Sequence, residues 1–448
     1  MTHTRPRWLE RSIWYHLFPL GFLGAERDNP APGAADGAIE HRIPRLEAWL
    51  GYLVDLGVDT LLLGPVFESE THGYDTVDYY RVDRRLGDEA DLIALVEACH
   101  RLGLRVVLDG VFNHVARSFP QFRDVLDQRD SSPWANWFQI NFDEPGRDGF
   151  TYADFEGHGH LVQLRHDEPA VVELLVDVAC HWLDRGIDGW RLDAAYAVPT
   201  TFWDTFSTRV RARHPHAVLV GEVIHGDYGH FVTAAGVDSV TQYELWKAIW
   251  SSLNDANFFE LAHALGRHGE LTETFPPYNF VGNHDVTRIA SRLNDFRHVS
   301  QAVAMLLTLP GVPAIYAGDE QGFTGIKLDE IGGDDAVRPA FPAHPSDLPA
   351  HGWGSHALHH ELIALRRRHP AAARGRIELV QVSNERLAYR VAGEDDELLV
   401  ALNIADTDMQ LPLPSGSSVS RVEAGSAVMG HRTVTVAPHS WAVMGDGR

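Results

Sequence analysis

The stretch Arg105-Val106-Val107-Leu108-Asp109 decides the fold, because its pattern recurs along most of the chain. Three consecutive apolar residues have the length of a short buried strand, and residues 91–102 before them carry apolar side chains at helical spacing. Strands that are apolar on both faces and alternate with helices are typical of a parallel sheet covered by helices. The stretch therefore predicts one unit of an α/β fold.

Seven further stretches of strand length alternate with helical patterns up to residue 370. They are 13–19, 60–67, 189–194, 217–223, 239–243, 278–281 and 312–316. Eight strand–helix units in one chain predict a (β/α)8 TIM barrel. A doubly wound open sheet is the alternative, and eight units make it the weaker interpretation.

Two segments interrupt this alternation and predict the domain organisation. Residues 115–160 are polar and aromatic and too long for an ordinary loop, so they predict a short inserted B domain between barrel parts 1–114 and 161–370. The aromatic stretch 133–138 fits either the core of that domain or a sugar platform. Residues 371–448 form short alternating runs and predict a C-terminal all-β sandwich domain.

Composition excludes several classes of protein. The formal net charge is −24, which disfavours nucleic acid and anionic lipid as partners. Cys99 and Cys180 both lie in helical patterns, so buried thiols are expected rather than a disulfide or a metal cluster. The first residues lack an apolar signal segment, and no run of about 18 apolar residues follows. We therefore expect a cytoplasmic protein without a membrane partner.

Ionisable side chains gather where several predicted strands end. These residues are Asp109, Arg191, Asp193, Glu222 and Asp285. The carboxyl ends of barrel strands meet on one face, where active sites of this fold are built. One such carboxylate is explained by a salt bridge or a helix cap, but four from four strands indicate a functional site.

The spacing of these residues suggests a chemistry. Arg191 and Asp193 are two apart on one strand, so they share a face, and the guanidinium is expected to keep Asp193 ionised. Glu222 follows an apolar run, so partial burial is expected to favour its acid form. An ionised and a protonated carboxyl on neighbouring strand ends is the arrangement of a retaining glycosidase.

Five short motifs, in order along the chain, resemble those of the α-amylase family of glycoside hydrolases (family 13). They are residues 71–75 (THGYD), 109–114 (DGVFNH), 189–195 (GWRLDAA), 221–223 (GEV) and 280–285 (FVGNHD). The resemblance covers essentially the whole chain. Within the family, the chain is most similar to the cyclomaltodextrinase, neopullulanase and maltogenic amylase group, which includes hydrolases of cyclic maltosyl-maltose.

The resemblance assigns roles to residues at matching positions. It implies that Asp193 is the nucleophile, Glu222 the acid/base, and Asp285 the residue that binds sugar hydroxyls and tunes Glu222. The residues that it implies for substrate binding or its support are Tyr74, His72, His114, Arg191, His284, Asp109 and His225. Among these, Tyr74 would stack on the sugar, His114 and His284 would hydrogen-bond to it, and Asp109 would support the site.

Two departures from the family pattern refine these expectations. Thr71 stands where exo-acting α-glucosidases carry an Asp that holds the terminal sugar, so a strict exo-glucosidase is not expected. Gln163 stands where calcium-dependent members carry an Asp, and a neutral amide holds the ion weakly beside Asn113. We therefore expect no cofactor, no metal ligand among the site residues, and no calcium at the family's usual position.

The sequence thus predicts a retaining hydrolase of α-1,4 bonds in short or cyclic α-glucooligosaccharides, with α-1,6 bonds left open. The alternative is an α-glucan transferase or isomerase on the same scaffold, in which a sugar hydroxyl replaces water. A non-catalytic family member would be expected to lack Asp193, Glu222 or Asp285, and all three are present. The expected partner is the oligosaccharide substrate, and a homodimer is left open.

Overall fold

Eight short parallel strands form one sheet in a computed structural model that describes residues 5–29, 38–330, 332–414 and 416–447. The strands are β1 (Trp14–Leu17), β2 (Thr60–Leu63), β5 (Arg105–Gly110), β11 (Gly189–Leu192), β12 (Val218–Gly221), β13 (Ser239–Val240), β14 (Tyr278–Phe280) and β15 (Val312–Tyr316). Their order is β13-β12-β11-β5-β2-β1-β15-β14, so consecutive strands lie side by side and the first strand, β1, pairs with the last, β15. This arrangement confirms the predicted (β/α)8 barrel.

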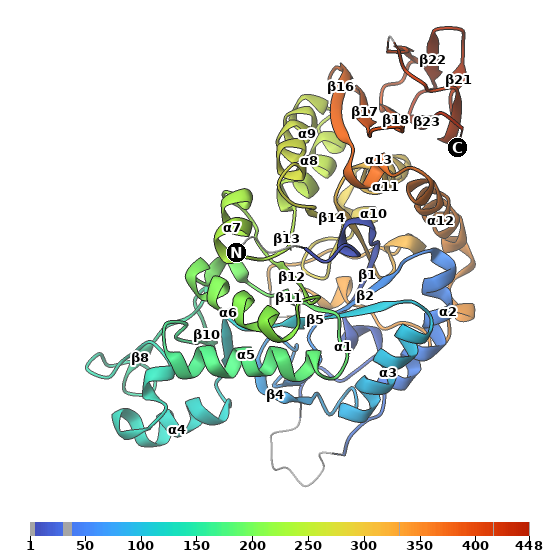
Figure 1. Cartoon of the computed structure of the whole chain (residues 1–448). Helices are drawn as coiled ribbons and strands as arrows, with labels where there is room; N and C mark the ends of the chain where they lie inside the picture. Colours follow the sequence, from blue (N-terminus) through green and yellow to red (C-terminus); the bar gives the residue numbers. More distant parts are fainter. Residues whose placement is uncertain (1–4, 30–37, 331, 415, 448) are drawn as a thin grey trace.

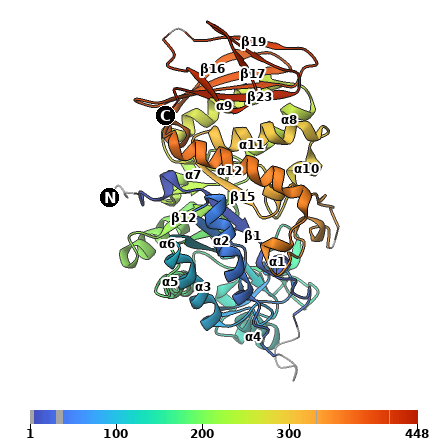
Figure 2. The same ribbon diagram turned by 90° about the vertical axis from the view of Figure 1, so that its right-hand side faces the viewer.

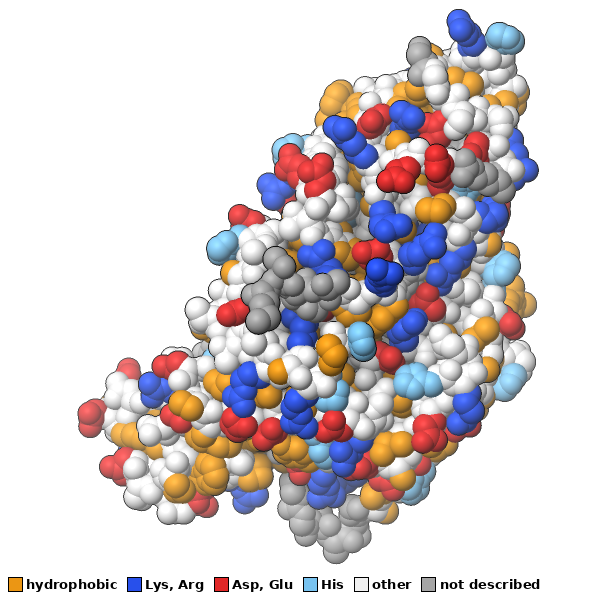
Figure 3. Space-filling model, in the orientation of Figure 1, with side chains coloured by type: hydrophobic (Ala, Val, Ile, Leu, Met, Phe, Trp, Pro, Cys, Tyr) orange, Lys and Arg blue, Asp and Glu red, His pale blue; other side chains and the backbone are white. Residues whose placement is uncertain are grey.

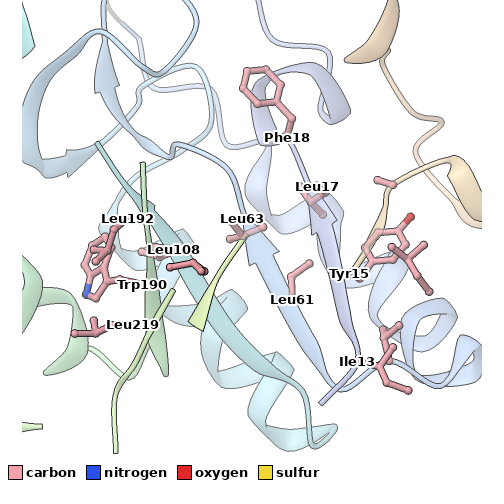
Figure 4. Packing of buried hydrophobic residues seen from close by; sticks show 14 of the residues in the cluster. Ile13, Tyr15, Leu17, Phe18, Leu61, Leu63, Leu108, Trp190, Leu192 and Leu219 are labelled. Atoms are coloured by element: carbon pink, nitrogen blue, oxygen red, sulfur yellow. The ribbon is translucent and has the colours of Figure 1, made fainter. Parts of the chain in front are cut away.

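Side chains of the strands alternate between the inside of the barrel and the surrounding helices. One apolar cluster fills the interior and includes Trp14, Leu62, Val107, Val220 and Phe280. The strand residues that alternate with them pack outward and belong to a second, larger apolar cluster. Figure 4 shows part of that cluster, with labels on Ile13, Tyr15, Leu17, Phe18, Leu61, Leu63, Leu108, Trp190, Leu192 and Leu219. Successive side chains of a strand point to opposite faces, so every second residue of a strand faces the barrel interior. We call this alternation the parity of a strand residue.

The sheet closes into a barrel by a narrow seam between β13 and β14. One parallel bridge joins Thr241 to Tyr278, and the backbone N–H of Gln242 donates to the carbonyl of Tyr278 at 2.9 Å. Helix α8 (Tyr243–Asn254) covers this seam, with the Tyr243 and Trp246 rings packed on Phe280. The sequence had predicted a strand through residue 243, but the strand ends at Val240 and the Gln242 side chain caps α8 instead.

Helices surround the barrel (Figure 1), and two of them, α7 (Tyr228–Ala235) and α8, were not predicted from the sequence. They are α2 (Glu47–Leu56), α3 (Glu89–Arg101), α5 (Pro169–Leu183), α6 (Thr200–Arg213), α7 (Tyr228–Ala235), α8, α9 (Phe258–Thr272), α11 (Val299–Thr308) and α12 (Trp353–Arg368). Each presents an apolar face to the outward side chains of the strands, as the main core cluster shows. Burial of that face, more than helix propensity, stabilises these helices.

The insertion after β5 folds as a small unit beside the catalytic end of the barrel. It contains α4 (Pro120–Gln128), a hairpin of β7 (Ile140–Asn141) and β8 (Thr151–Tyr152), and a sheet of β6 (His114–Ala116), β10 (His158–Gln163) and β9 (Asp154–Phe155). Trp137 and Phe138 are buried, and the Trp134 ring meets Trp137 edge-on at 4.8 Å. The aromatic stretch 133–138 therefore contributes to the core of the insertion rather than to an open sugar platform.

The C-terminal strands form two antiparallel sheets that lie against the barrel helices (Figure 2). One contains β16 (Arg376–Val382), β17 (Arg386–Ala392), β18 (Glu397–Asn403), β23 (Ser440–Gly445) and β20 (Arg421–Gly425), and the other β19 (Met409–Pro412), β22 (Thr433–Val436) and β21 (Val428–Met429). Apolar residues from both sheets, such as Leu399 and Val434, form a separate core. The side chain of Gln301 on α11 donates to the carbonyl of Asn403 at 3.2 Å and joins this domain to the barrel.

No helix among the described residues has the length and apolar character needed to span a membrane. On the face drawn in Figure 3, acidic and basic side chains lie close to one another and are mixed with apolar ones. The negative net charge is therefore accompanied by many exposed cations, all but two of them arginines.

Candidate active site

The parity of the barrel strands brings the predicted ionisable residues to one place. Asp109 has the same parity as the interior residue Val107, and Glu222 has that of Val220. Arg191 and Asp193 alternate with the outward residues Trp190 and Leu192. All four side chains therefore point into the barrel above its apolar interior, at the carboxyl ends of β5, β11 and β12.

Arg191 is the centre of this group and is only 3% exposed. Its Nη1 donates to Asp109 at 2.6 and 2.7 Å and to Asp193 Oδ1 at 3.3 Å. Its Nη2 lies 2.7 Å from Glu222 Oε1. One guanidinium therefore contacts both carboxyl groups of the predicted catalytic pair and holds them on the same side of the barrel mouth.

The charge balance at Asp193 differs from the sequence expectation. Burial, followed by the negative charge of Glu222, raises the pKa of Asp193 well above its usual range, and Arg191 only partly opposes this effect. Arg191 is less effective than expected because it also binds Asp109 and Glu222. The expectation that Arg191 alone keeps Asp193 ionised therefore does not hold, because burial and the charge of Glu222 oppose the guanidinium.

Glu222 is surrounded by hydrogen-bond donors rather than by apolar groups alone. Besides Arg191, the backbone N–H of Ala194 donates to Oε2 at 2.9 Å, and the hydroxyl of Tyr243 donates to Oε1 at 3.1 Å. Ala194 reaches this position in a left-handed conformation with φ 46°. Three donors from three elements therefore fix the position of the Glu222 carboxyl group.

Asp285 lies on the opposite side of the site, after β14. Its carboxylate accepts from Arg338 at 2.9 Å and lies 2.9 Å from His284 Nε2. Burial alone would raise the pKa of Asp285, but His284 and Arg338 together hold this pKa well below its usual range. Asp285 is therefore ionised at neutral pH and remains 30% exposed, so it can accept hydrogen bonds from sugar hydroxyls.

The two histidines that were expected to bind sugar have other contacts. His114 is 1% exposed, and its nitrogens meet the Tyr74 carbonyl at 2.9 Å and the Asn113 amide at 3.1 Å. Burial lowers the pKa of His114 to about 3, so the ring is neutral. His284 is fully buried, and its Nε2 contacts Asp285 and the hydroxyl of Tyr74. In this structure, both rings therefore position other site residues.

Tyr74 is held in place on three sides. Its hydroxyl donates to Asp109 at 3.1 Å, and its ring stacks on His284 with centroids 5.4 Å apart and planes 6° apart. The backbone N–H of Tyr74 lies 3.2 Å from His72 Nδ1. The Tyr74 ring is partly exposed and available as a stacking surface for sugar.

His225 lies apart from this cluster, exposed on the loop after β12. Its ring is 6.4 Å from that of Tyr196, whose hydroxyl donates at 2.6 Å to Glu156 at the tip of the β9–β10 hairpin. This bond links the insertion to the barrel next to the catalytic pair. Tyr196, Glu156 and His225 thus border one side of the site.

Sequence reasoning did not assign roles to four residues that contact this cluster. They are His16, Phe18, Tyr243 and Arg338. His16 is the one polar residue at an inward position of β1, and its ring lies 4.9 Å from that of His284. Its inward position on the strand could have identified it from the sequence. Arg338 reaches Asp285 through the path of the long loop after β15, which no local sequence pattern records.

Comparison with known proteins agrees with this geometry. The family model described as "Alpha amylase, catalytic domain" matches residues 45–348. The maltogenic alpha-amylase of Bacillus acidopullulyticus is 30% identical over 435 residues, covering 91% of this chain and 72% of that protein. The cyclomaltodextrinase of Geobacillus thermopakistaniensis is 30% identical over 440 residues, covering 91% and 71%.

A solved structure shows the same architecture over the full described length. The cyclic alpha-maltosyl-(1→6)-maltose hydrolase from Arthrobacter globiformis has a TM-score of 0.82 and 27% identity, and the match covers 99% of each chain. Together, these matches show a glycoside hydrolase that retains the configuration of the bond it cleaves. The chain belongs to the alpha-amylase family.

The contacts of Arg191 predict that lysine cannot replace it. Arg191→Lys leaves a single ammonium that cannot bind Asp109, Asp193 and Glu222 together, because it lacks the planar fork of a guanidinium. We expect kcat/KM to fall about 100-fold or more, and the free energy of unfolding to fall by about 3 kcal/mol. Arg374→Lys is the matched control, since Arg374 is exposed and pairs only with Glu10 among the contacts recorded for it. Equal losses in the two variants would contradict the central role of Arg191.

Proposed function

We propose that the enzyme hydrolyses α-1,4 bonds of short or cyclic α-glucooligosaccharides, and α-1,6 bonds in the same substrates. The observation that carries this proposal is the wall of the site beside Thr71. The Thr71 hydroxyl donates to Asp75 at 2.6 Å and its backbone N–H donates to the same carboxylate at 3.0 Å. Thr71 therefore offers no free charged acceptor to hold a terminal sugar.

A cavity opens where such a clamp would close the site. Its volume is about 330 Å³, and its lining includes Phe18, Thr71, His72 and Arg338. His72 and Arg338 both contact the predicted catalytic cluster, so the cavity continues directly from it. A site that is open at this end accepts a substrate without a free chain end, such as a ring.

The activities of similar proteins support this substrate class. They include a cyclomaltodextrinase and a cyclic alpha-maltosyl-(1→6)-maltose hydrolase, which act on cyclic α-glucans. An intracellular maltogenic amylase of Bacillus subtilis also matches at 30% identity. We infer from this relative that the enzyme meets imported oligosaccharides inside the cell rather than polymeric starch outside it.

The proposed mechanism uses two displacements. In the first, Glu222 protonates the oxygen of the scissile bond while the Asp193 carboxylate attacks the anomeric carbon and forms a glycosyl ester. In the second, Glu222 takes a proton from water, the water oxygen attacks the same carbon, and the ester bond to Asp193 breaks. Two inversions retain the α configuration.

We propose that Asp285 stays ionised beneath the hydroxyls of the sugar ring throughout the reaction. Burial opposes this state, but His284 and Arg338 hold the pKa of Asp285 well below its usual range. The entering sugar excludes water from the catalytic pair.

The proposed roles predict two different rescue products. Asp193→Ala removes the nucleophile, so azide should attack the substrate directly and give a β-glycosyl azide from an activated glucoside. Glu222→Ala leaves the ester intermediate intact, so azide should attack this intermediate and give an α-glycosyl azide. Proton NMR of the products distinguishes the two anomers. The same anomer from both variants would contradict the assignment.

The substrate proposal predicts an order of kcat/KM values. Maltotetraose, a cyclic tetrasaccharide and a cyclodextrin should exceed p-nitrophenyl α-glucoside and soluble starch by about tenfold or more, the effect of lacking one charge-assisted hydrogen bond to a chain end. Thr71→Ala should change each value by less than about twofold, because Thr71 holds Asp75 rather than sugar. The proposal fails if the nitrophenyl glucoside or starch reacts fastest.

We also propose that activity does not require calcium. The Gln163 amide approaches Asn113 Oδ1 at 3.5 Å, so a donor lies beside an oxygen that would have to bind the ion. Dialysis against a chelator should leave kcat/KM and the melting temperature unchanged. Loss of activity that calcium alone restores would overturn this proposal. Gln163→Asp, which restores a charged ligand, is the matched variant and should acquire calcium-dependent stability.

A further inference from the structure

Side chains from the barrel and from the C-terminal domain meet where α11 begins. Asp295 caps the 3-10 turn η6 (Phe296–His298), and His439 lies in the turn before β23. His298 Nε2 lies 3.1 Å from His439 Nδ1 and 3.9 Å from Asp295 Oδ2, and each of the three residues offers a ligand atom within 4.8 Å of those of the other two. Figure 2 shows α11 under the sheet that contains β23, so the three residues stand on both sides of the domain junction.

The far nitrogen of His439 has a carboxylate partner. His439 Nε2 lies 2.8 Å from Asp406 Oδ1. An ionised carboxylate only accepts hydrogen bonds, so Nε2 carries the proton, and in the neutral ring Nδ1 keeps its lone pair toward His298. Metal-binding histidines commonly donate their second nitrogen to a carboxylate in this way. The His439 ring is therefore oriented as a ligand, at the cost of a left-handed backbone with φ 49°.

Other bonds hold the two domains together around this cluster. Gln301 Nε2 donates to the Asn403 carbonyl at 3.2 Å, and Trp441 Nε1 donates to the Ser300 hydroxyl at 2.9 Å. The Asp295 side chain is 31% exposed. The cluster therefore lies in a junction that is already positioned, and it is open to solvent on the Asp295 side.

Two imidazole nitrogens and one carboxylate oxygen form a ligand set typical of zinc. Tetrahedral coordination with zinc–ligand distances of about 2.0–2.1 Å separates two ligand atoms by about 3.3 Å. The observed separations of 3.1 and 3.9 Å lie on either side of this value, so rotations of the side chains bring the three atoms onto one ion. Calcium is disfavoured, because it takes about six to eight oxygen ligands.

Arg297 balances the charge of Asp295 when no ion is bound. Its Nε donates to Asp295 Oδ1 at 3.0 Å and to Oδ2 at 2.9 Å. The Arg297 side chain is 59% exposed, so it can turn into solvent. An ion at Asp295 therefore competes with this guanidinium.

We propose that Asp295, His298 and His439 bind a zinc ion that joins the barrel to the C-terminal domain, with water as the fourth ligand. On binding, the proton that His298 Nε2 shares with His439 moves to His298 Nδ1, so both rings stay neutral and each gives one lone pair to the ion. The ion exchanges with solvent, and the enzyme dialysed without zinc is the reference state. This inference does not depend on the proposed function, because it concerns binding and stability rather than turnover.

The test measures zinc binding to the full-length enzyme by titration of zinc chloride against a fluorescent chelator. His298→Asn and His439→Asn each remove one ligand and keep a side chain that can hydrogen-bond, and each should weaken the tightest Kd about 100-fold or more. Asp406→Asn removes only the partner of His439 and should weaken it about tenfold. Zinc should raise the melting temperature of the wild type but not that of either histidine variant.

His100→Asn is the matched control, because His100 is an exposed histidine that faces one carboxylate, that of Asp188, at 2.9 Å. Its Kd and its zinc-induced rise in melting temperature should equal those of the wild type. If His298→Asn or His439→Asn binds zinc as tightly as the wild type, the ion lies on others of the 26 histidines, and the inference is overturned.

A variant that keeps all three ligands separates zinc binding from any loss of folding in the histidine variants. Arg297→Ala removes the competing guanidinium and should tighten the zinc Kd about threefold, the effect of an exposed ion pair. Crystals grown with zinc chloride should show an anomalous-scattering peak between His298 and His439 at the zinc absorption edge. A Kd that is unchanged or weaker in Arg297→Ala, or the lack of a peak at this position, overturns the inference.

Discussion

One buried guanidinium, that of Arg191, holds the carboxyl groups of the active site together. Arg191 faces Asp109, Asp193 and Glu222 inside a barrel whose interior is otherwise apolar. Burial raises the pKa of Asp109 and of Asp193, and the charge of Arg191 opposes this rise in both residues. Without the guanidinium, three carboxyl groups from three neighbouring strands would lie together in the barrel with no cation beside them. Arg191 is therefore the contact on which the arrangement of the site depends.

The alternation of side chains along strands explains how much of the structure could be predicted. Apolar runs on both faces identified all eight barrel strands, and carboxylates at their ends identified the catalytic cluster. Parity alone then places Asp109, Arg191 and Glu222 in the interior. These features depend on local sequence and on one topological rule, so they can be inferred without coordinates.

Other features depend on contacts that sequence patterns do not record. His114 and His284 turned out to support Tyr74 and Asp285, because their ring orientations follow from packing across several loops. Arg338 reaches Asp285 only through the course of the loop after β15. That Arg191 contacts three carboxyl groups rather than Asp193 alone could likewise be seen only from interatomic distances. The predicted catalytic residues thus lie at strand ends, whose positions can be predicted from the sequence. The residues that surround them lie on loops, whose paths are harder to predict.

The closure of the barrel has a consequence for how the enzyme loses activity on heating. Between β13 and β14, a single parallel bridge, which includes the bond from the Gln242 N–H to the Tyr278 carbonyl, replaces a continuous ladder, and α8 covers the gap. Few backbone hydrogen bonds have to break for this region to open, so its amide protons should exchange with solvent earlier than those of β1, β2 and β5. Because α8 carries Tyr243, such an opening would break the hydrogen bond from Tyr243 to Glu222 while most of the barrel stayed folded. Inactivation would then precede global unfolding, and the lifetime of the active enzyme would be set by this seam rather than by the core.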